Sequence, residues 1–174
     1  MRDKLLEVFP QGIKTLLDLG CRDCWHTAGL PGVIRHVGVD AWPPALERGR
    51  QKAAGGGIPH FEPVLSDALV YLQERDDGAF DAVLAIDLLE HLEEAAALHL
   101  LDEMVRVAGK IAIIWTTLGM IQQGPVDVDG NHNPFEEHKW GPRPSQFIER
   151  GWKVRSFPLW HKDRGGAILA WLSK

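Results

Sequence analysis

Short, unbroken apolar stretches alternate with segments of helical periodicity over the first two thirds of the chain. The apolar stretches are residues 15–21, 35–42, 80–87 and 110–117, and residues 60–68 are expected to form a further short strand that reaches Asp67. Helical periodicity is found between them, at residues 43–54, 68–75 and 93–108. Strands that are apolar on both sides belong to parallel sheets covered on both faces, and helices between them make right-handed crossovers. This alternation predicts a doubly wound α/β sheet.

The pattern changes after residue 117. Residues 118–142 are polar, rich in Gly, Pro, Asn and His, and without periodicity, so a long loop with a substrate-specific role is expected there. A short helix at 143–151 and two strands at 152–160 and 166–174 follow. The connection between these strands is too short for a parallel crossover, which predicts an antiparallel hairpin at the C-terminus.

Length and composition restrict the class of protein. The 174 residues predict one domain over 1–174, and a net charge of -5 argues against a nucleic-acid partner. No apolar run approaches the ~20 residues of a membrane span, and the first ten residues lack the apolar segment of a signal peptide. We therefore expect a cytoplasmic protein without a membrane partner. The sequence does not predict an oligomeric state.

Acidic residues stand at the ends of several predicted strands. In open parallel sheets, ligands bind beyond the carboxyl ends of the strands. Here those ends carry Gly20 and Cys21, Asp40 and Ala41, Asp67, Asp87, and Thr116 and Thr117. Asp40 lies about 20 residues after Gly20, the spacing at which a carboxylate binds the hydroxyls of a ribose. The alternative is that Asp40 caps the helix that follows it.

At this point the chain resembles a known family. The stretches "LLDLGC", "VGVDAW", "SDA" and "FDAVLAIDLLEHLEE", in this order and spacing, resemble class I S-adenosylmethionine-dependent methyltransferases, in particular small single-domain enzymes of types 11 and 12. The resemblance covers residues 13–117, and the last two strands match by architecture. It implies a Rossmann-like, mostly parallel sheet with an antiparallel C-terminal hairpin strand and helices on both faces. It also implies S-adenosylmethionine as the cofactor.

The resemblance assigns cofactor contacts residue by residue. It places the methionine part of the cofactor at the first loop, the ribose at Asp40, the adenine at the residues after Asp40 and at the third strand, and the sulfonium at the fourth strand. The residues so implied are Asp18, Gly20, Cys21 and Arg22; Asp40, Ala41 and Trp42; Asp67 and Ala68; and Ile86 and Asp87. His91 lies just behind the last pair, and its implied role is to orient the loop.

The first loop departs from the family pattern. The family has glycine where this chain has Arg22 and Cys24. A position that requires positive φ is strained by about 1 kcal/mol when it is not glycine. Two interpretations compete: Arg22 pairs with the carboxylate of the cofactor, or the loop is degraded and binds cofactor weakly. The second would make the chain an inactive cofactor-binding module that acts through a partner.

Cys21 and Cys24 have the spacing of a redox or metal motif. A zinc site would need two further ligands, and no second cysteine pair is present, so we predict no metal and interpret the cysteines as small apolar fillers under the loop. A nicotinamide-dependent dehydrogenase is a further alternative. It would need Gly-x-Gly-x-x-Gly after the first strand, which this chain lacks.

The remaining predictions concern the acceptor. His138, in "EEHKWGP", is predicted as the catalytic base, whereas His132 is equally well explained as part of a solvated loop. The chain is close to the minimal length of such a domain and offers little surface to a macromolecule. We therefore expect O- or N-methylation of a small-molecule acceptor, whose identity the sequence does not reveal.

Overall fold

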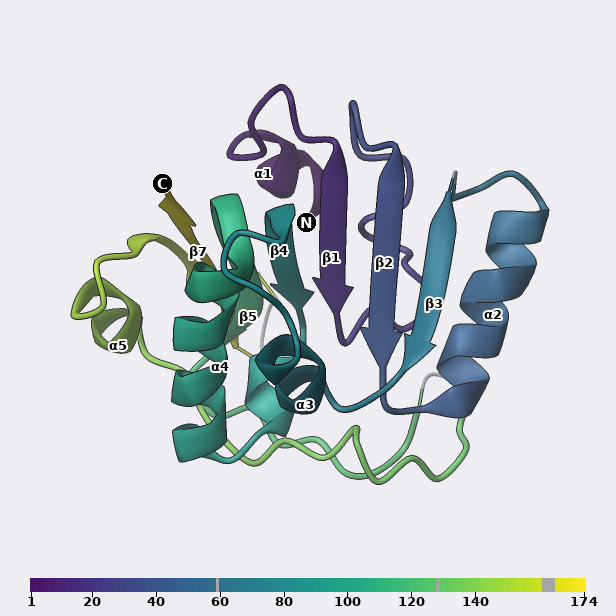
Figure 1. The fold of residues 1–174 in the computed structure, drawn as a ribbon. Coiled ribbons are helices and arrows are strands. Elements are labelled where there is room, and N and C mark those ends of the chain that lie inside the picture. The colour runs from purple at the N-terminus through teal and green to yellow at the C-terminus, as the bar shows by residue number, and fades with distance from the viewer. Residues whose placement is uncertain (59, 128, 161–164) are drawn as a thin grey trace.

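A computed structural model describes residues 1–58, 60–127, 129–160 and 165–174. A seven-stranded sheet in the order β3-β2-β1-β4-β5-β7-β6 forms its centre (Figure 1). Neighbouring strands from β3 to β5 pair in parallel, and β7 pairs antiparallel with both β5 and β6. The strands are β1 (Thr15–Leu19), β2 (Arg35–Asp40), β3 (Phe61–Leu65), β4 (Phe80–Ile86), β5 (Ala108–Leu118), β6 (Lys153–Phe157) and β7 (Gly166–Ser173). The predicted fold class is confirmed.

Helices lie on both faces of this sheet. They are α1 (Arg2–Leu6), α2 (Pro43–Ala54), α3 (Ala68–Gln73), α4 (Glu94–Val107) and α5 (Pro144–Ile148), with a 3₁₀ turn, η1, at Leu89–His91. Successive residues of the central strands point to opposite faces, so each strand contributes to two cores. In β1, for example, Leu17 and Leu19 pack with α3, α4 and α5, whereas Leu16 packs with Leu5 of α1.

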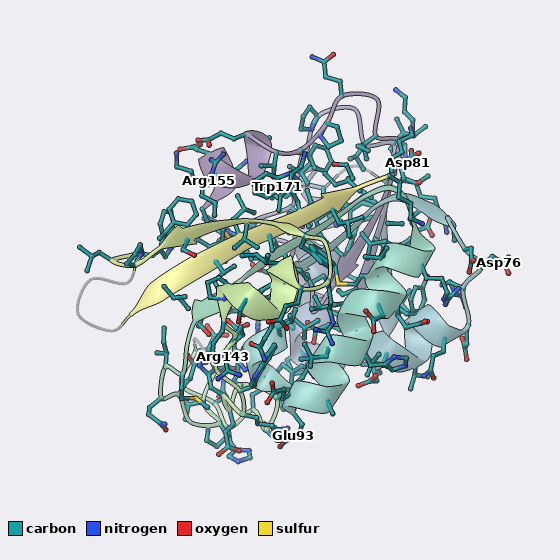
Figure 2. All side chains as sticks on the ribbon, turned by 90° about the vertical axis from the view of Figure 1, so that its left-hand side faces the viewer. Asp76, Asp81, Glu93, Arg143, Arg155 and Trp171 are labelled. Atoms are coloured by element: carbon teal, nitrogen blue, oxygen red, sulfur yellow. The ribbon has the colours of Figure 1, made fainter. Side chains whose placement is uncertain are left out.

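The face of the sheet that α1 covers is visible in Figure 2, which views the sheet from its β6 side. Arg155 of β6 and Trp171 of β7 lie next to α1, and the guanidinium of Arg155 stands 5.8 Å from the Trp171 ring. Arg155 also forms an ion pair with Glu7, just after α1. These contacts hold the first helix to the antiparallel end of the sheet.

Several element ends differ from the sequence predictions. The first strand stops at Leu19 and not at residue 21, because Gly20 turns the backbone into the left-handed region (φ 61°). The strand expected over 152–160 stops at Phe157, because Pro158 has no N–H for the ladder. Helix α1 was not expected. The predicted hairpin is present, with β7 rather than β6 joined to β5; residues 161–164 of its connection lie outside the described residues.

The long polar loop after β5 runs along the edge of the sheet where the parallel strands end. In Figure 1 this segment passes below the arrowheads of β1 to β3 and reaches α2. Its contacts with the α2 region are an ion pair between Asp129 and Arg48 (3.2 Å) and an edge-on ring contact between Phe135 and Trp42. The loop therefore covers the edge at which ligands of such sheets bind. In the described part of the chain, no helix has the length and apolarity needed to cross a membrane.

Candidate active site

A pocket of about 880 Å³ lies between the carboxyl ends of the parallel strands and the loop after β5. This volume is within the range of small-molecule sites. The structure brings all the residues predicted from the sequence together around this one cavity. They are Asp18, Gly20, Cys21, Arg22, Asp40, Ala41, Trp42, Asp67, Ala68, Ile86, Asp87 and His138.

The first loop of the pocket has three residues in the left-handed backbone conformation, although only one of them is glycine. Gly20 has φ 61°, and a Cβ added there would lie 2.8 Å from the side chain of Leu88. Arg22 (φ 55°) and Cys24 (φ 56°) are also left-handed, at the two positions where the resemblance leads us to expect glycine. The loop therefore has a left-handed backbone at positions where the resemblance implies glycine, and this conformation is strained at Arg22 and Cys24.

The carboxylate of Asp40, at the end of β2, joins this loop to the start of α2. One of its oxygens accepts a hydrogen bond from the N–H of Arg22 and the other accepts one from the N–H of Trp42, each at 2.8 Å. Burial raises the pKa of this carboxyl, and the two backbone bonds lower it. Asp40 is not the cap of α2, whose N-cap residue is Trp42. Each oxygen has a second lone pair with which to bind a ligand hydroxyl.

A buried polar cluster lies beneath the loop. Asp18 accepts a hydrogen bond from the hydroxyl of Thr27, and its carboxylate lies 3.5 Å from the Nε2 of His36. Although burial would lower the pKa of His36, Asp18 and Cys24 raise it to about 9. Cys21 and Cys24 are free buried thiols that pack with Leu46, which agrees with their interpretation as fillers.

Two buried donors that line the pocket have no hydrogen-bond partner among the described residues. They are the indole Nε1 of Trp42 and the hydroxyl of Thr117. Asp67, in contrast, is occupied: one of its oxygens accepts hydrogen bonds from the N–H groups of Leu69 and Val70 and so caps α3. Both atoms are buried from solvent, so each leaves an unpaired donor in the wall of the pocket.

The opposite end of the pocket carries two histidines and a buried acid. The rings of His91 and His138 are 4.8 Å apart and meet edge to face. The backbone carbonyl of Glu90 accepts hydrogen bonds from the N–H groups of Lys139 (2.8 Å) and Trp140 (3.2 Å), which attaches the loop to η1. The side chain of Glu90 is fully buried, and one of its oxygens accepts a hydrogen bond from Thr116 (2.7 Å).

Burial is the main cause of the pKa shifts of the titratable groups at this end of the pocket. It raises the pKa of Asp87 to about 6, and together with the charge of Asp87 it raises that of Glu90 to about 8. Burial, and then the proximity of His138, lower the pKa of His91 to about 4. His91 is thus a neutral imidazole near neutral pH.

Sequence reasoning missed part of this end. It left His91 out of the catalytic group and did not consider Glu90, although the two stand side by side in "DLLEHL". Both line the pocket with His138. His132, the other histidine of the loop, is exposed and is not among the residues that line the pocket.

Comparison with known families agrees with this geometry. A family model described as "Methyltransferase domain" matches residues 16–110, more than half of the chain. The chain belongs to the methyltransferase domain family. The predicted enzyme class and its cofactor, S-adenosylmethionine, are thereby confirmed. A search of curated proteins finds no match.

Several solved structures share the fold at low sequence identity. A methyltransferase from Archaeoglobus fulgidus is 16% identical with a TM-score of 0.67, and the match covers 100% of this chain and 95% of that one. A phosphoethanolamine N-methyltransferase from Haemonchus contortus, solved with phosphoethanolamine and S-adenosylhomocysteine, is 14% identical with a TM-score of 0.69. EvdMO1 is 20% identical with a TM-score of 0.64. Matches to these two cover 99% of this chain but only 42% and 39% of the longer chains.

Proposed function

We propose that this methyltransferase transfers a methyl group from S-adenosylmethionine to an oxygen or nitrogen of a small-molecule acceptor. The observation that carries the proposal is the single pocket that runs from Asp40 to His138. One end of this pocket carries the residues predicted to bind the cofactor. The other end carries His91 and His138, which are not among those predicted contacts. A cofactor and a small acceptor would fit together in a cavity of this size.

The residues present fit the cofactor. Asp40 would hold the ribose hydroxyls, Trp42 and Ala68 would lie against the adenine, and the loop from Gly20 to Arg22 would bind the methionine part. Asp67 would line the adenine site while its carboxylate caps α3. When bound, S-adenosylmethionine supplies the methyl group from a sulfonium and leaves as S-adenosylhomocysteine. Most of the contribution of the chain is then alignment of the acceptor with that methyl group.

The histidine-bearing end would bind the reacting atom of the acceptor. The Nδ1 of His138 lies 2.7 Å from the carbonyl of Ile121, and because a carbonyl only accepts, Nδ1 carries the proton. The lone pair of this imidazole is therefore on Nε2. As the predicted base, His138 would use that lone pair to take the proton of a hydroxyl acceptor.

Enclosure of the pocket supports a small acceptor. The loop after β5 lies across the strand ends and is attached on one side to Glu90 and on the other to Arg48. The Haemonchus enzyme, which shares the fold, is a phosphoethanolamine N-methyltransferase. A cytoplasmic location, the absence of a nucleic-acid partner and the extent of the domain stay predictions of the sequence.

The test is transfer of a labelled methyl group. The purified chain is incubated with S-adenosylmethionine that carries a labelled methyl group and with pools of small molecules that bear hydroxyls or amines. We expect label in one pool, together with S-adenosylhomocysteine formation that depends on that pool. Binding of S-adenosylhomocysteine without transfer to any pool would instead support the cofactor-binding module that acts through a partner.

A further inference from the structure

Three side chains at the acceptor end of the pocket form a set of metal ligands. One oxygen of Glu90 and one nitrogen each of His91 and His138 lie within 4.8 Å of one another. Two imidazoles and one carboxylate are the ligand set of many divalent transition-metal sites. We propose that Glu90, His91 and His138 hold one divalent transition-metal ion.

The surroundings hold the two histidine rings in the tautomer that a metal requires. The Nδ1 of His91 lies 3.3 Å from the carbonyl of Glu137, and the Nδ1 of His138 lies 2.7 Å from that of Ile121. Both rings therefore carry their proton on Nδ1 and a lone pair on Nε2. A histidine ligand usually has its other nitrogen bound in this way, because the contact fixes its tautomer and orientation. Thr116 orients the Glu90 carboxylate in the same sense.

The charge of this end also suits a cation. Asp87 and Glu136 line the same pocket, so two further carboxyl groups lie at the cavity into which the site would open.

A metal ion at this position could bind and activate the acceptor. Three protein ligands leave coordination positions toward the cavity, where a hydroxyl or carboxylate oxygen of the acceptor could bind. A metal ion lowers the pKa of a bound hydroxyl, so it would take over from His138 the activation of an oxygen acceptor. This last step rests on the proposed function. The metal site itself does not.

Titration of the metal-free full chain with Co²⁺ tests the inference, because Co²⁺ bound to protein ligands has visible absorption bands. We expect saturation at one equivalent. His138→Gln and Glu90→Gln should each weaken Co²⁺ binding at least about 10-fold. His132→Gln and Glu137→Gln make the same chemical changes at exposed side chains beside the site and should leave the affinity unchanged.

Two results would overturn the inference: no saturable Co²⁺ binding up to millimolar metal, or binding that all four variants retain. Calorimetry with S-adenosylhomocysteine on the same metal-free protein separates this failure from that of the proposed function. Cofactor binding without Co²⁺ binding would rule out the metal site and leave the proposed function standing. Circular dichroism of Glu90→Gln verifies its fold, and His138→Gln, on the partly exposed loop, provides a second variant.

Discussion

The carboxylate of Asp40 accepts a hydrogen bond from the backbone N–H of Arg22 at 2.8 Å. The acid predicted to bind the ribose thus also holds the residue that replaces a glycine in the first loop. Since the bond comes from the backbone, it does not depend on which side chain stands at position 22. A glycine at position 22 would make the same backbone hydrogen bond to Asp40.

Arg22→Gly should stabilise the protein. Arg22 has φ 55°, and glycine adopts this conformation without the steric cost that other residues incur. We expect the free energy of unfolding to rise by about 0.5–1 kcal/mol in urea denaturation. Arg22→Ala is the control, because it removes the side chain but keeps a Cβ. Equal stabilities of the two variants would show that the left-handed backbone is not strained.

Two adjacent threonines should differ in their contribution to stability. Thr116→Val removes the hydroxyl that donates to the fully buried Glu90, and should cost about 1–3 kcal/mol in the free energy of unfolding. Thr117→Val removes a hydroxyl without a partner among the described residues, so the ligand-free protein should lose little. Thermal or urea unfolding of both variants checks this. A larger loss for Thr117→Val would contradict the hydrogen-bond assignment.

Stability should fall at alkaline pH through His36. Its pKa is about 9 in the folded protein and near 6.5 when unfolded, so its stabilising interaction is fully present below pH 6.5 and is lost as the pH rises through 9. The loss is up to about 3 kcal/mol. Urea unfolding at pH 6 and at pH 9.5 should therefore show a larger drop for the wild type than for His36→Gln. Parallel pH profiles would rule out a charged His36.

Asp81 should stabilise the start of β1. Its carboxylate accepts hydrogen bonds from the N–H groups of Lys14 (2.7 Å) and Thr15 (3.1 Å) and pairs with Lys110. Asp81→Ala should cost about 1.5–3 kcal/mol. The ion pair with Lys110 lowers its pKa, so this stabilisation is present above the ordinary pKa and is lost as the pH falls through the folded value.

Asp76→Ala is the matched control for Asp81→Ala. Both acids lie at the same end of the molecule in Figure 2, but Asp76 is exposed, and its carboxylate forms no hydrogen bond or ion pair with the described residues. Its replacement should leave the urea midpoint unchanged at neutral pH. If both variants lose the same amount, the bonds of Asp81 contribute nothing specific.

The sequence predicts the elements whose signals are local. Helix α2 begins at Pro43 and ends at Ala54, as expected from a proline at its start and glycines after its end. Strand β4 follows directly from an apolar run in which Asp81 is the one charged residue. Helix α1 has five residues, too few to show a period, and its position depends on Leu5 packing under the sheet.

The half of the pocket that is predicted to bind the cofactor can be located from the sequence for a topological reason. Parallel strands end at one edge of the sheet, and the pocket residues Gly20, Asp40, Asp67 and Asp87 lie at or just after these strand ends. The acceptor half cannot be located in this way. His138 is held near Glu90 and His91 by long-range contacts, among them the hydrogen bonds from Lys139 and Trp140 to the Glu90 carbonyl. No local pattern encodes these contacts, although the Glu-His pair in "DLLEHL" indicates where they form.

The most direct test of the account is calorimetric titration of the purified chain with S-adenosylhomocysteine, with Asp40→Asn and Asp76→Asn compared under the same conditions. The account predicts saturable binding to the wild type and to Asp76→Asn. It predicts affinity at least about 10-fold weaker for Asp40→Asn, because the charged hydrogen bonds to the ribose are lost. Absence of binding to the wild type up to millimolar ligand, or equal affinity for all three proteins, would contradict it.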